Sequence, residues 1–373
     1  MKAATSIAPA SQPAARPAAW IQGSSWDFTW LIGSALIVPV VLLFVWGGAS
    51  SVLINLGTTA VVGGPHLFAT FLASYGDPRF RRSHRPLLWL AALGMPALVV
   101  WGTLANFQVL LSVFIFTASL HVLHQNAYLT DVYRRKAGLP EPRWARFVDY
   151  ALLMLCIYPI ASYKLVHSNF YLGDIEILIP RFLKVPATYW AVWIAFSALL
   201  GLWLWKTANE WRQGVLNRPK TLLIATTTCI AFFVPASADG ARLELAFQAV
   251  NAWHSVQYLG VVWFILKERR ERGELQGSFV QRLAGAGRAT LWFYTFCFAV
   301  TSSLLLVLFA LSWWNPVGLS FDQYYYMGVL SCLLIHYVLD GYFFAVGNLR
   351  ATAAERVPYA LPALRSAAAA RPA

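Results

Sequence analysis

Five histidines and one aspartate lie inside long apolar stretches of this 373-residue chain. They are His66, His121, His124, His254, His336 and Asp340. An ionisable side chain in such a stretch is costly unless it has a partner or a function. Imidazole with a carboxylate is a ligand set typical of iron, zinc or copper, whereas the four cysteines are isolated and predict no thiolate site. We therefore predict that the five histidines bind metal.

Helical spacing places several of these groups on shared faces, because residues three or four apart are neighbours on a helix. His121 and His124 could hold one ion from one helix, and His336 and Asp340 could do so from another. Asp340 is the one acidic residue deep inside a predicted span, so we expect it to be ionised beside a cation or neutralised by a proton. The number of ligands fits either a mononuclear or a dinuclear site.

Other polar side chains extend these helix faces. We expect Asn251 and Gln125 to contribute to cofactor binding, through hydrogen bonds that orient the metal ligands. We expect Tyr258 and Gln257, together with Asp340, to act as catalytic groups that orient the reactants or transfer protons. The remaining two histidines, His84 and His167, fall in connecting segments and predict no function.

The elements that carry these residues have the length and composition of transmembrane helices. With 58% hydrophobic residues, 12% charged residues and a mean hydropathy of +0.56, the chain is too apolar for an ordinary soluble globular protein. Stretches of roughly 18 to 24 apolar residues recur, and each is long enough to cross a bilayer. We predict an all-α polytopic membrane helix bundle of ten spans. They cover residues 28–47, 52–75, 87–104, 108–129, 147–165, 187–206, 220–236, 244–266, 289–312 and 323–346.

The positive charges predict the orientation of these spans. One set of alternate connections and the C-terminal segment carry 23 Lys and Arg residues, and the other set carries 4, which places both termini in the cytoplasm. Because the charges flank spans, the net charge of +13 predicts no nucleic-acid binding. We predict one transmembrane domain over 26–348, with flexible tails at 1–25 and 349–373. In this orientation the five histidines fall in one slab roughly 10 Å thick.

Two of the histidine-bearing segments resemble those of a known family. Gly64-Pro65-His66 and His121-Val122-Leu123-His124, the latter after Phe114-Ile115-Phe116, are similar to the histidine motifs of the Brp/Blh β-carotene oxygenases. Those are polytopic membrane enzymes of bacteria and archaea that use iron to cleave β-carotene to retinal with oxygen. The resemblance implies that His66, His121 and His124 are metal ligands and that the metal is iron.

These observations predict a multi-pass enzyme of the bacterial cytoplasmic (inner) membrane. It would use iron to oxidise an apolar substrate dissolved in the lipid bilayer, such as a carotenoid, isoprenoid or acyl chain. Zinc, copper or a b-type haem are the alternative cofactors. A reductant would have to come from a separate electron-donor protein, for which the basic loops offer a docking surface. The alternative function is a non-catalytic transporter or a haem- or metal-binding subunit of a larger complex.

Overall fold

The structure is a computed structural model that describes residues 20–138, 141–275, 278–285 and 287–344. Residues 1–19 and 349–373, most of the two predicted tails, lie outside this described part. The predicted transmembrane domain is described up to Phe344. Ile21 belongs to the predicted N-terminal tail, but it is buried and its backbone N–H donates to Asp27 at 2.8 Å, so this end of the tail is already packed on the bundle.

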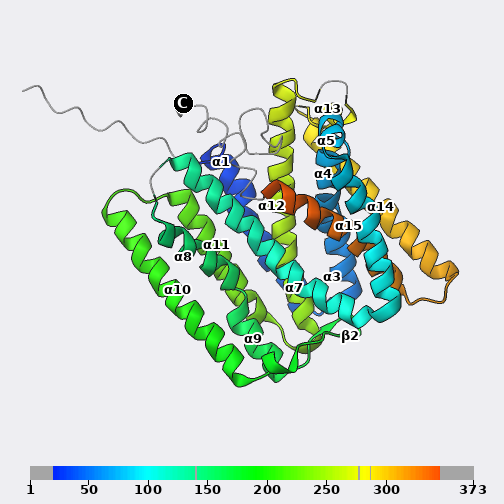
Figure 1. Ribbon diagram of the computed structural model, residues 1–373, viewed down its shortest axis with the longest axis horizontal. Coiled ribbons are helices and arrows are strands. Elements are labelled where there is room, and N and C mark those ends of the chain that lie inside the picture. The colour runs from blue at the N-terminus through cyan, green and yellow to red at the C-terminus, as the bar shows by residue number, and fades with distance from the viewer. Residues whose placement is uncertain (1–19, 139–140, 276–277, 286, 345–373) are drawn as a thin grey trace, which may run out of the picture.

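Helices make up nearly all of the described chain, as predicted, and Figure 1 shows them arranged as a bundle. In chain order they are α1 (Ser24–Asp27), α2 (Ile37–Trp46), α3 (Ser51–Thr58), α4 (Gly64–Ser74), α5 (Pro78–Ser83), α6 (Arg85–Trp89), α7 (Met95–Ala137), α8 (Arg143–Leu155), α9 (Tyr158–His167), α10 (Pro186–Arg212), α11 (Arg218–Phe233), α12 (Leu243–Glu271), α13 (Phe279–Leu283), α14 (Ala289–Trp314) and α15 (Phe321–Phe344). A short antiparallel hairpin of β1 (Tyr171–Leu172) and β2 (Ile175–Glu176) lies between α9 and α10.

Several helices join end to end into longer rods through π-helical turns. Such turns are η1 (Phe28–Ile32), η3 (Thr59–Gly63) and η4 (Leu90–Gly94), and the 3-10 turn η2 (Gly33–Leu36) follows η1. Eight of the described helical segments are long and apolar enough to cross a membrane, as expected of a polytopic membrane protein. They are Ser24–Trp46, Ser51–Ser74, Arg85–Ala137, Arg143–His167, Pro186–Arg212, Arg218–Ser237, Ala289–Trp314 and Phe321–Phe343.

The difference between ten predicted spans and these eight segments has two causes, and the first is Asn106. Predicted spans 87–104 and 108–129 both lie in the segment Arg85–Ala137, which is interrupted by the non-helical backbone of Asn106 (φ −161°, ψ 88°). The Asn106 side chain caps the second arm by accepting from Val109 N–H at 3.0 Å. A Cβ on Gly102 would lie 3.2 Å from Leu110, so the two arms are in close contact beside the bend.

The second cause is α12, which occupies the predicted span 244–266 but is less apolar than the eight segments. It is buried along most of its length and packs against α2, α4 and α7. In Figure 1 it stands between α10 and α14, which form opposite edges of the bundle. Because protein rather than lipid surrounds it, α12 can carry polar side chains through the middle of the fold.

Buried charges join the helices at the end of the bundle away from the hairpin. Asp149 of α8 forms ion pairs with Lys206 of α10 and with Lys220 of α11, the latter at 3.0 Å, and all three side chains are buried. Lys220 also pairs with Glu141 at 2.6 Å. Burial alone would raise the pKa of Glu141, but the positive charges of Lys220, Lys206 and Arg134 outweigh burial and hold that pKa below its ordinary value.

Neutralising the centre of this network should destabilise the bundle. Asp149→Asn leaves Lys206 and Lys220 with too little negative charge in a buried site, and we expect the free energy of unfolding to fall by about 3 kcal/mol. The measurement is unfolding of the detergent-solubilised protein, followed by circular dichroism. The matched control is Asp239→Asn, because Asp239 pairs with Lys164 at 2.6 Å but is 86% exposed. It should cost less than about 1 kcal/mol, and equal losses in the two variants would refute the role given to the buried network.

Candidate metal centre

Four helices bring the predicted ligand residues together in the interior. His66 lies on α4, His121 on the second arm of α7, His254 on α12, and both His336 and Asp340 on α15. All are buried except His121, which is largely buried, with 11% of its side chain exposed. These residues are far apart in the sequence, so their meeting is a property of the tertiary fold.

Local sequence explains how α4 reaches this position. A Cβ on Gly64 would lie 2.0 Å from a side-chain carbon of Thr301, so only glycine allows α4 to approach α14 this closely. Pro65 follows the π-helical turn within the same rod and has no N–H to donate to the preceding turn. The Val61 carbonyl, four residues earlier, accepts from the Tyr294 hydroxyl at 2.7 Å. His66 follows directly and points to the interior between α12 and α15.

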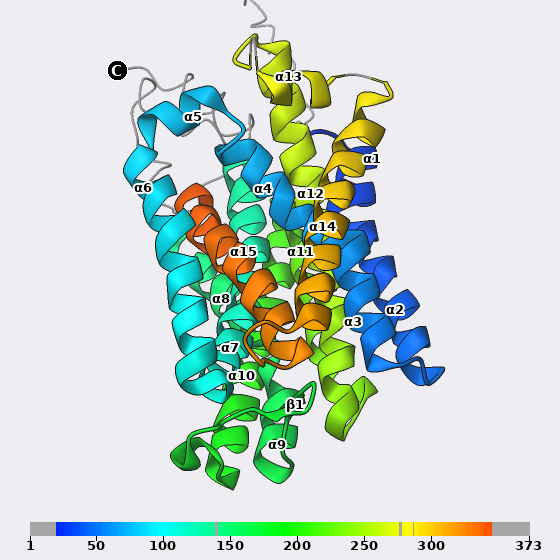
Figure 2. The same cartoon turned by 90° about the vertical axis from the view of Figure 1, so that its right-hand side faces the viewer.

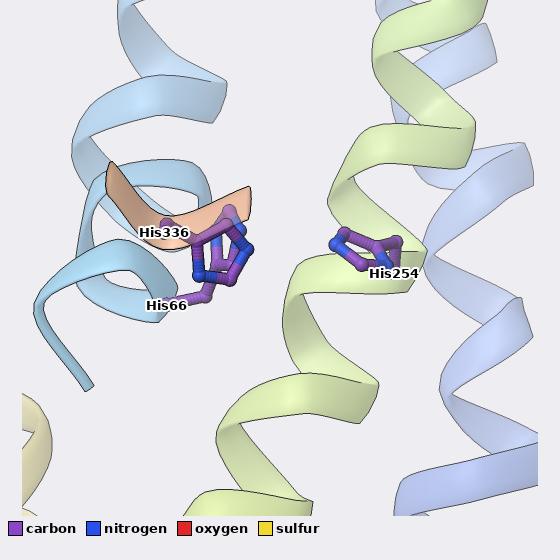
Figure 3. A group of neighbouring side chains, drawn as sticks. All are labelled: His66, His254 and His336. Carbon is purple, nitrogen blue, oxygen red and sulfur yellow. The ribbon is translucent and has the colours of Figure 1, made fainter. Parts of the chain in front are cut away.

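The ligand atoms form two overlapping groups. His66, His254 and His336 each offer one nitrogen, and these nitrogens lie within 4.8 Å of one another; Figure 3 shows His254 facing the other two rings from α12. His121, His336 and Asp340 form the second group under the same limit. The Nε2 atoms of His121 and His336 are 3.1 Å apart, close to the separation of about 3.3 Å expected for two nitrogens on one tetrahedral ion. His336 belongs to both groups, so the arrangement fits one ion or two adjacent ions.

Several of these atoms have no hydrogen-bond partner within the described chain. They are Nε2 of His66, both ring nitrogens of His254 and Oδ2 of Asp340. Oδ2 of Asp340 faces Nε2 of His336 at 3.4 Å and Nε2 of His121 at 3.8 Å, at ion-pair range but beyond a hydrogen bond. Each unsatisfied buried polar group costs about 1–3 kcal/mol. A cation among these atoms would satisfy a lone pair on each of these three residues, so the residues present fit a metal ion.

Hydrogen bonds behind the ligands fix their orientation. The Tyr258 hydroxyl donates to Oδ1 of Asp340 at 2.5 Å, so Thr70 must donate to the Tyr258 oxygen at 2.7 Å. Nδ1 of His336, 2.7 Å from the Thr70 hydroxyl, must then carry the proton and donate to Thr70. Nε2 of His336 is therefore unprotonated, which is the form that binds a metal.

The other histidines have their own supports. Nδ1 of His66 bonds the Ser255 hydroxyl at 3.1 Å, which leaves Nε2 of His66 facing the centre. His121 stacks on Tyr337, with ring centroids 4.0 Å apart and an angle of 23° between the rings. His254 contacts His66 edge to face at 5.3 Å between centroids.

Four predicted site residues lie outside the two groups of ligand atoms. His124 is half-buried and belongs to neither group of three, so its predicted role beside His121 stays a prediction. Gln125 donates to the backbone carbonyl of His254 at 3.3 Å and to Gln257 at 3.1 Å. Gln257 in turn donates to the Leu31 carbonyl at 2.5 Å, so these two glutamines join helices and do not reach the centre. Asn251 bonds Gln248 and lines the cavity next to the centre.

Sequence reasoning missed Thr70 and Ser255. A signal was present for both, because Thr70 follows His66 by four residues and shares its helix face, and Ser255 adjoins His254. A serine or threonine on an apolar helix is common, however, and its usual role is a hydrogen bond to the carbonyl one turn earlier. Only the meeting of α4, α12 and α15 distinguishes these two hydroxyls.

A cavity of about 180 Å³ opens on one side of the centre. His66, His121 and His254 line one of its ends. Its walls are mostly aromatic and aliphatic, and they include Phe114, Phe116, Phe170, Phe247, Leu330 and Leu333. The centre is therefore accessible to a small apolar molecule or to one end of a larger one.

Removal of the Thr70 hydroxyl should weaken metal binding without unfolding the protein. Thr70→Val keeps the shape but ends the hydrogen bonds to His336 and Tyr258, and such supports typically change metal affinity by about 10- to 100-fold. Titration of the metal-free protein with Fe(II) measures this, and Thr70→Ser should restore affinity. Thr228→Val is the control, since the Thr228 hydroxyl is buried without a partner on α11, and it should bind as the parent does. Unchanged metal affinity in Thr70→Val would refute the proposed role of the Thr70 hydroxyl in orienting His336.

Comparison with known proteins found no matching family model, curated protein or solved structure. The likeness to Brp/Blh oxygenases therefore stays a prediction that rests on the two histidine motifs. Of the residues in those motifs, His66 and His121 reach the centre and His124 does not. What the site can do has to be argued from its geometry.

Proposed function

We propose that the protein is a membrane-embedded, metal-dependent oxidoreductase with a non-haem iron centre. The observation that supports it is that unpartnered ligand atoms of His66, His254 and Asp340 gather beside an apolar cavity. An apolar cavity ending at a metal-ligand cluster is the arrangement required to bring an apolar substrate to a reactive ion. A carotenoid, isoprenoid or acyl chain is the substrate class, and one end of such a molecule would enter the cavity.

The ligand set favours a non-haem ion. It consists of imidazole nitrogens and one carboxylate, and histidines with one carboxylate are typical of Fe(II) centres that react with oxygen. The rings of His66 and His336 are in edge contact, with centroids 4.7 Å apart, and those of His121 and His336 are 5.0 Å apart. A porphyrin would have to lie between two such rings, and rings in contact leave no space for it.

When bound, iron would supply the activation of oxygen, and the chain supplies the rest. His66, His254 and His336 would hold the ion, with His121 and Asp340 completing the coordination from α7 and α15. Tyr258 lies between Thr70 and Asp340 and can hold a proton at its hydroxyl, next to the carboxylate. The apolar walls exclude water from the substrate.

The proposal includes a place for the chain in the cell. In this proposal the chain crosses the membrane ten times, because the two arms on either side of Asn106 count as separate spans and α12 is a further one. Both termini lie in the cytoplasm. We place it in the bacterial cytoplasmic membrane. Electrons would come from a donor protein that docks on the basic cytoplasmic loops.

Metal analysis of the purified protein tests the proposal. We expect iron in stoichiometric amounts and an optical spectrum without a Soret band. His254→Ala and His336→Ala should each lower the iron content to below a tenth, because each removes a ligand from the centre. A Soret band would show that the iron is held in a haem and would contradict the non-haem centre. A metal-free, colourless protein would favour the non-catalytic alternative.

A control variant distinguishes the ligand set seen in the structure from the full set of histidines predicted from the sequence. His124→Ala removes a histidine one turn from His121 that does not belong to the ligand groups, so it should retain the iron of the parent protein. Loss of iron in His124→Ala, with retention in His254→Ala, would contradict the proposed ligand set.

A further inference from the structure

The cavity has a second, polar end that the metal centre does not explain. Asn55 of α3, Thr59 of η3, Glu244 of α12 and Tyr325 of α15 line it. Glu244 and His254 are ten residues apart on α12, which is about 15 Å along the helix, and both line the same cavity. The cavity therefore extends from the histidines toward the end of the bundle that carries the β1–β2 hairpin, the lower end in Figure 2.

Glu244 lies at this end as a buried carboxylate without a positive partner. It is 3% exposed, and no ion pair joins it to a Lys, Arg or His within the described residues. Its two oxygens accept from Asn55 Nδ2 at 2.9 Å and from the backbone N–H of Gly173 at 2.8 Å. Two hydrogen bonds hold the carboxylate in place but leave lone pairs unused, since a carboxylate can accept about four.

Asn55 adds a second acceptor beside Glu244. Its Oδ1 atom is buried and has no hydrogen-bond partner within the described chain, while its Nδ2 is occupied by Glu244. The hydroxyls of Thr59 and Tyr325 are bonded to each other at 2.8 Å, which leaves one O–H of the pair free to donate. Acceptors thus dominate this end, and a molecule in the cavity can satisfy them only with an O–H or N–H donor.

The size of the cavity limits the molecule. An engineered protein cavity of about 150 Å³ holds one benzene molecule, so about 180 Å³ takes an apolar body on the order of eight carbons, or that much of a longer chain. Most of the remaining lining is apolar. Its polar side chains include two pairs that bond each other, Gln248 with Asn251 and Ser119 with Tyr158, and the two tyrosines Tyr326 and Tyr337. The cavity therefore combines one end rich in hydrogen-bond acceptors, a mostly apolar middle and an end lined by histidines.

We propose that the cavity binds a single-headed amphiphile, an alcohol or an amine, with its head group at Glu244 and Asn55. The head donates to the Glu244 carboxylate and to Oδ1 of Asn55. The apolar end then lies against His66, His121 and His254. Such an amphiphile would be the substrate class of the proposed oxidoreductase. The role of the histidine end rests on that proposed function. It also sets the position presented to the metal, which is the end of the molecule remote from its head.

Photolabelling of the full-length protein in lipid nanodiscs tests this directly. The probe is 1-octanol with a diazirine at carbon 7, and mass spectrometry locates the labelled residues. We expect label at the histidine end, on the segments around Phe116 and Leu333, and competition by unlabelled octanol or octylamine but not by octane. The stronger competitor identifies the head group. Label confined to the lipid-facing surface, or equal competition by octane, would overturn the proposal.

Variants separate the head site from general effects on the fold. Glu244→Gln removes the charge and one strong acceptor, and we expect at least a tenfold loss of specific labelling. Ala118→Trp fills the cavity wall and should abolish labelling even if Glu244→Gln fails to fold. Asp239→Asn removes an exposed carboxylate that does not line the cavity, and this variant should label as the parent does. Unchanged labelling in Glu244→Gln would overturn the assignment of the head group to Glu244 and Asn55.

The same experiment in His254→Ala distinguishes this inference from the proposed function. Octanol binding uses the far end of the cavity, so labelling should persist in that variant although its metal is lost. Persistent labelling with no metal in the parent protein would leave the binding site intact and refute the oxidoreductase. Metal in the parent protein without cavity labelling would leave the oxidoreductase proposal intact and refute the amphiphile site.

Discussion

The fold depends on partners for the polar groups that α12 carries through the middle of an apolar bundle. Water cannot solvate a buried imidazole or amide, so each needs a neighbour on another helix. Gln257 finds its partners on η1 and α7, and Ser255 finds His66 on α4. These bonds set how the helices stand around α12. Trp253 Nε1 and both ring nitrogens of His254 have no partner within the described residues. Of these two neighbours, only His254 lies where the other candidate ligand atoms gather, which is why we propose a functional role for it.

The supporting hydrogen bonds show how rigidity and chemistry are linked in this centre. The chain from His336 through Thr70 and Tyr258 to Asp340 connects α15 to α4, to α12 and back to α15. It fixes a tautomer and at the same time joins three helices, so the lone pair of His336 would be aligned before an ion binds. A centre prepared in this way would lose little conformational freedom on binding.

Much of this arrangement was predictable from the sequence, and the reason for the remainder is physical. Apolar runs predicted the helical class and their approximate positions, and the cost of burial singled out His66, His254, His336 and Asp340. Spacing alone could not distinguish His121 from His124, because the helix face shared by residues three apart is wider than the region where the ligand atoms gather. It also could not predict the contacts of Gln257, because an amide that bridges helices has the same sequence signature as one that meets a substrate. Thr70 and Ser255 were hidden because hydroxyls on apolar helices are usually satisfied within their own helix.

The π-helical turn η3, which joins α3 to α4, determines which side chains of α4 face the interior. A π turn accommodates one residue more than an α turn, so the helix beyond it is rotated by about 100° relative to an uninterrupted rod. His66 and Thr70 lie beyond this turn, whereas Asn55 lies before it. Without the extra residue in Thr59–Gly63, a different set of α4 side chains would face inward. The two ends of the cavity therefore keep their relative orientation through a single residue of chain length.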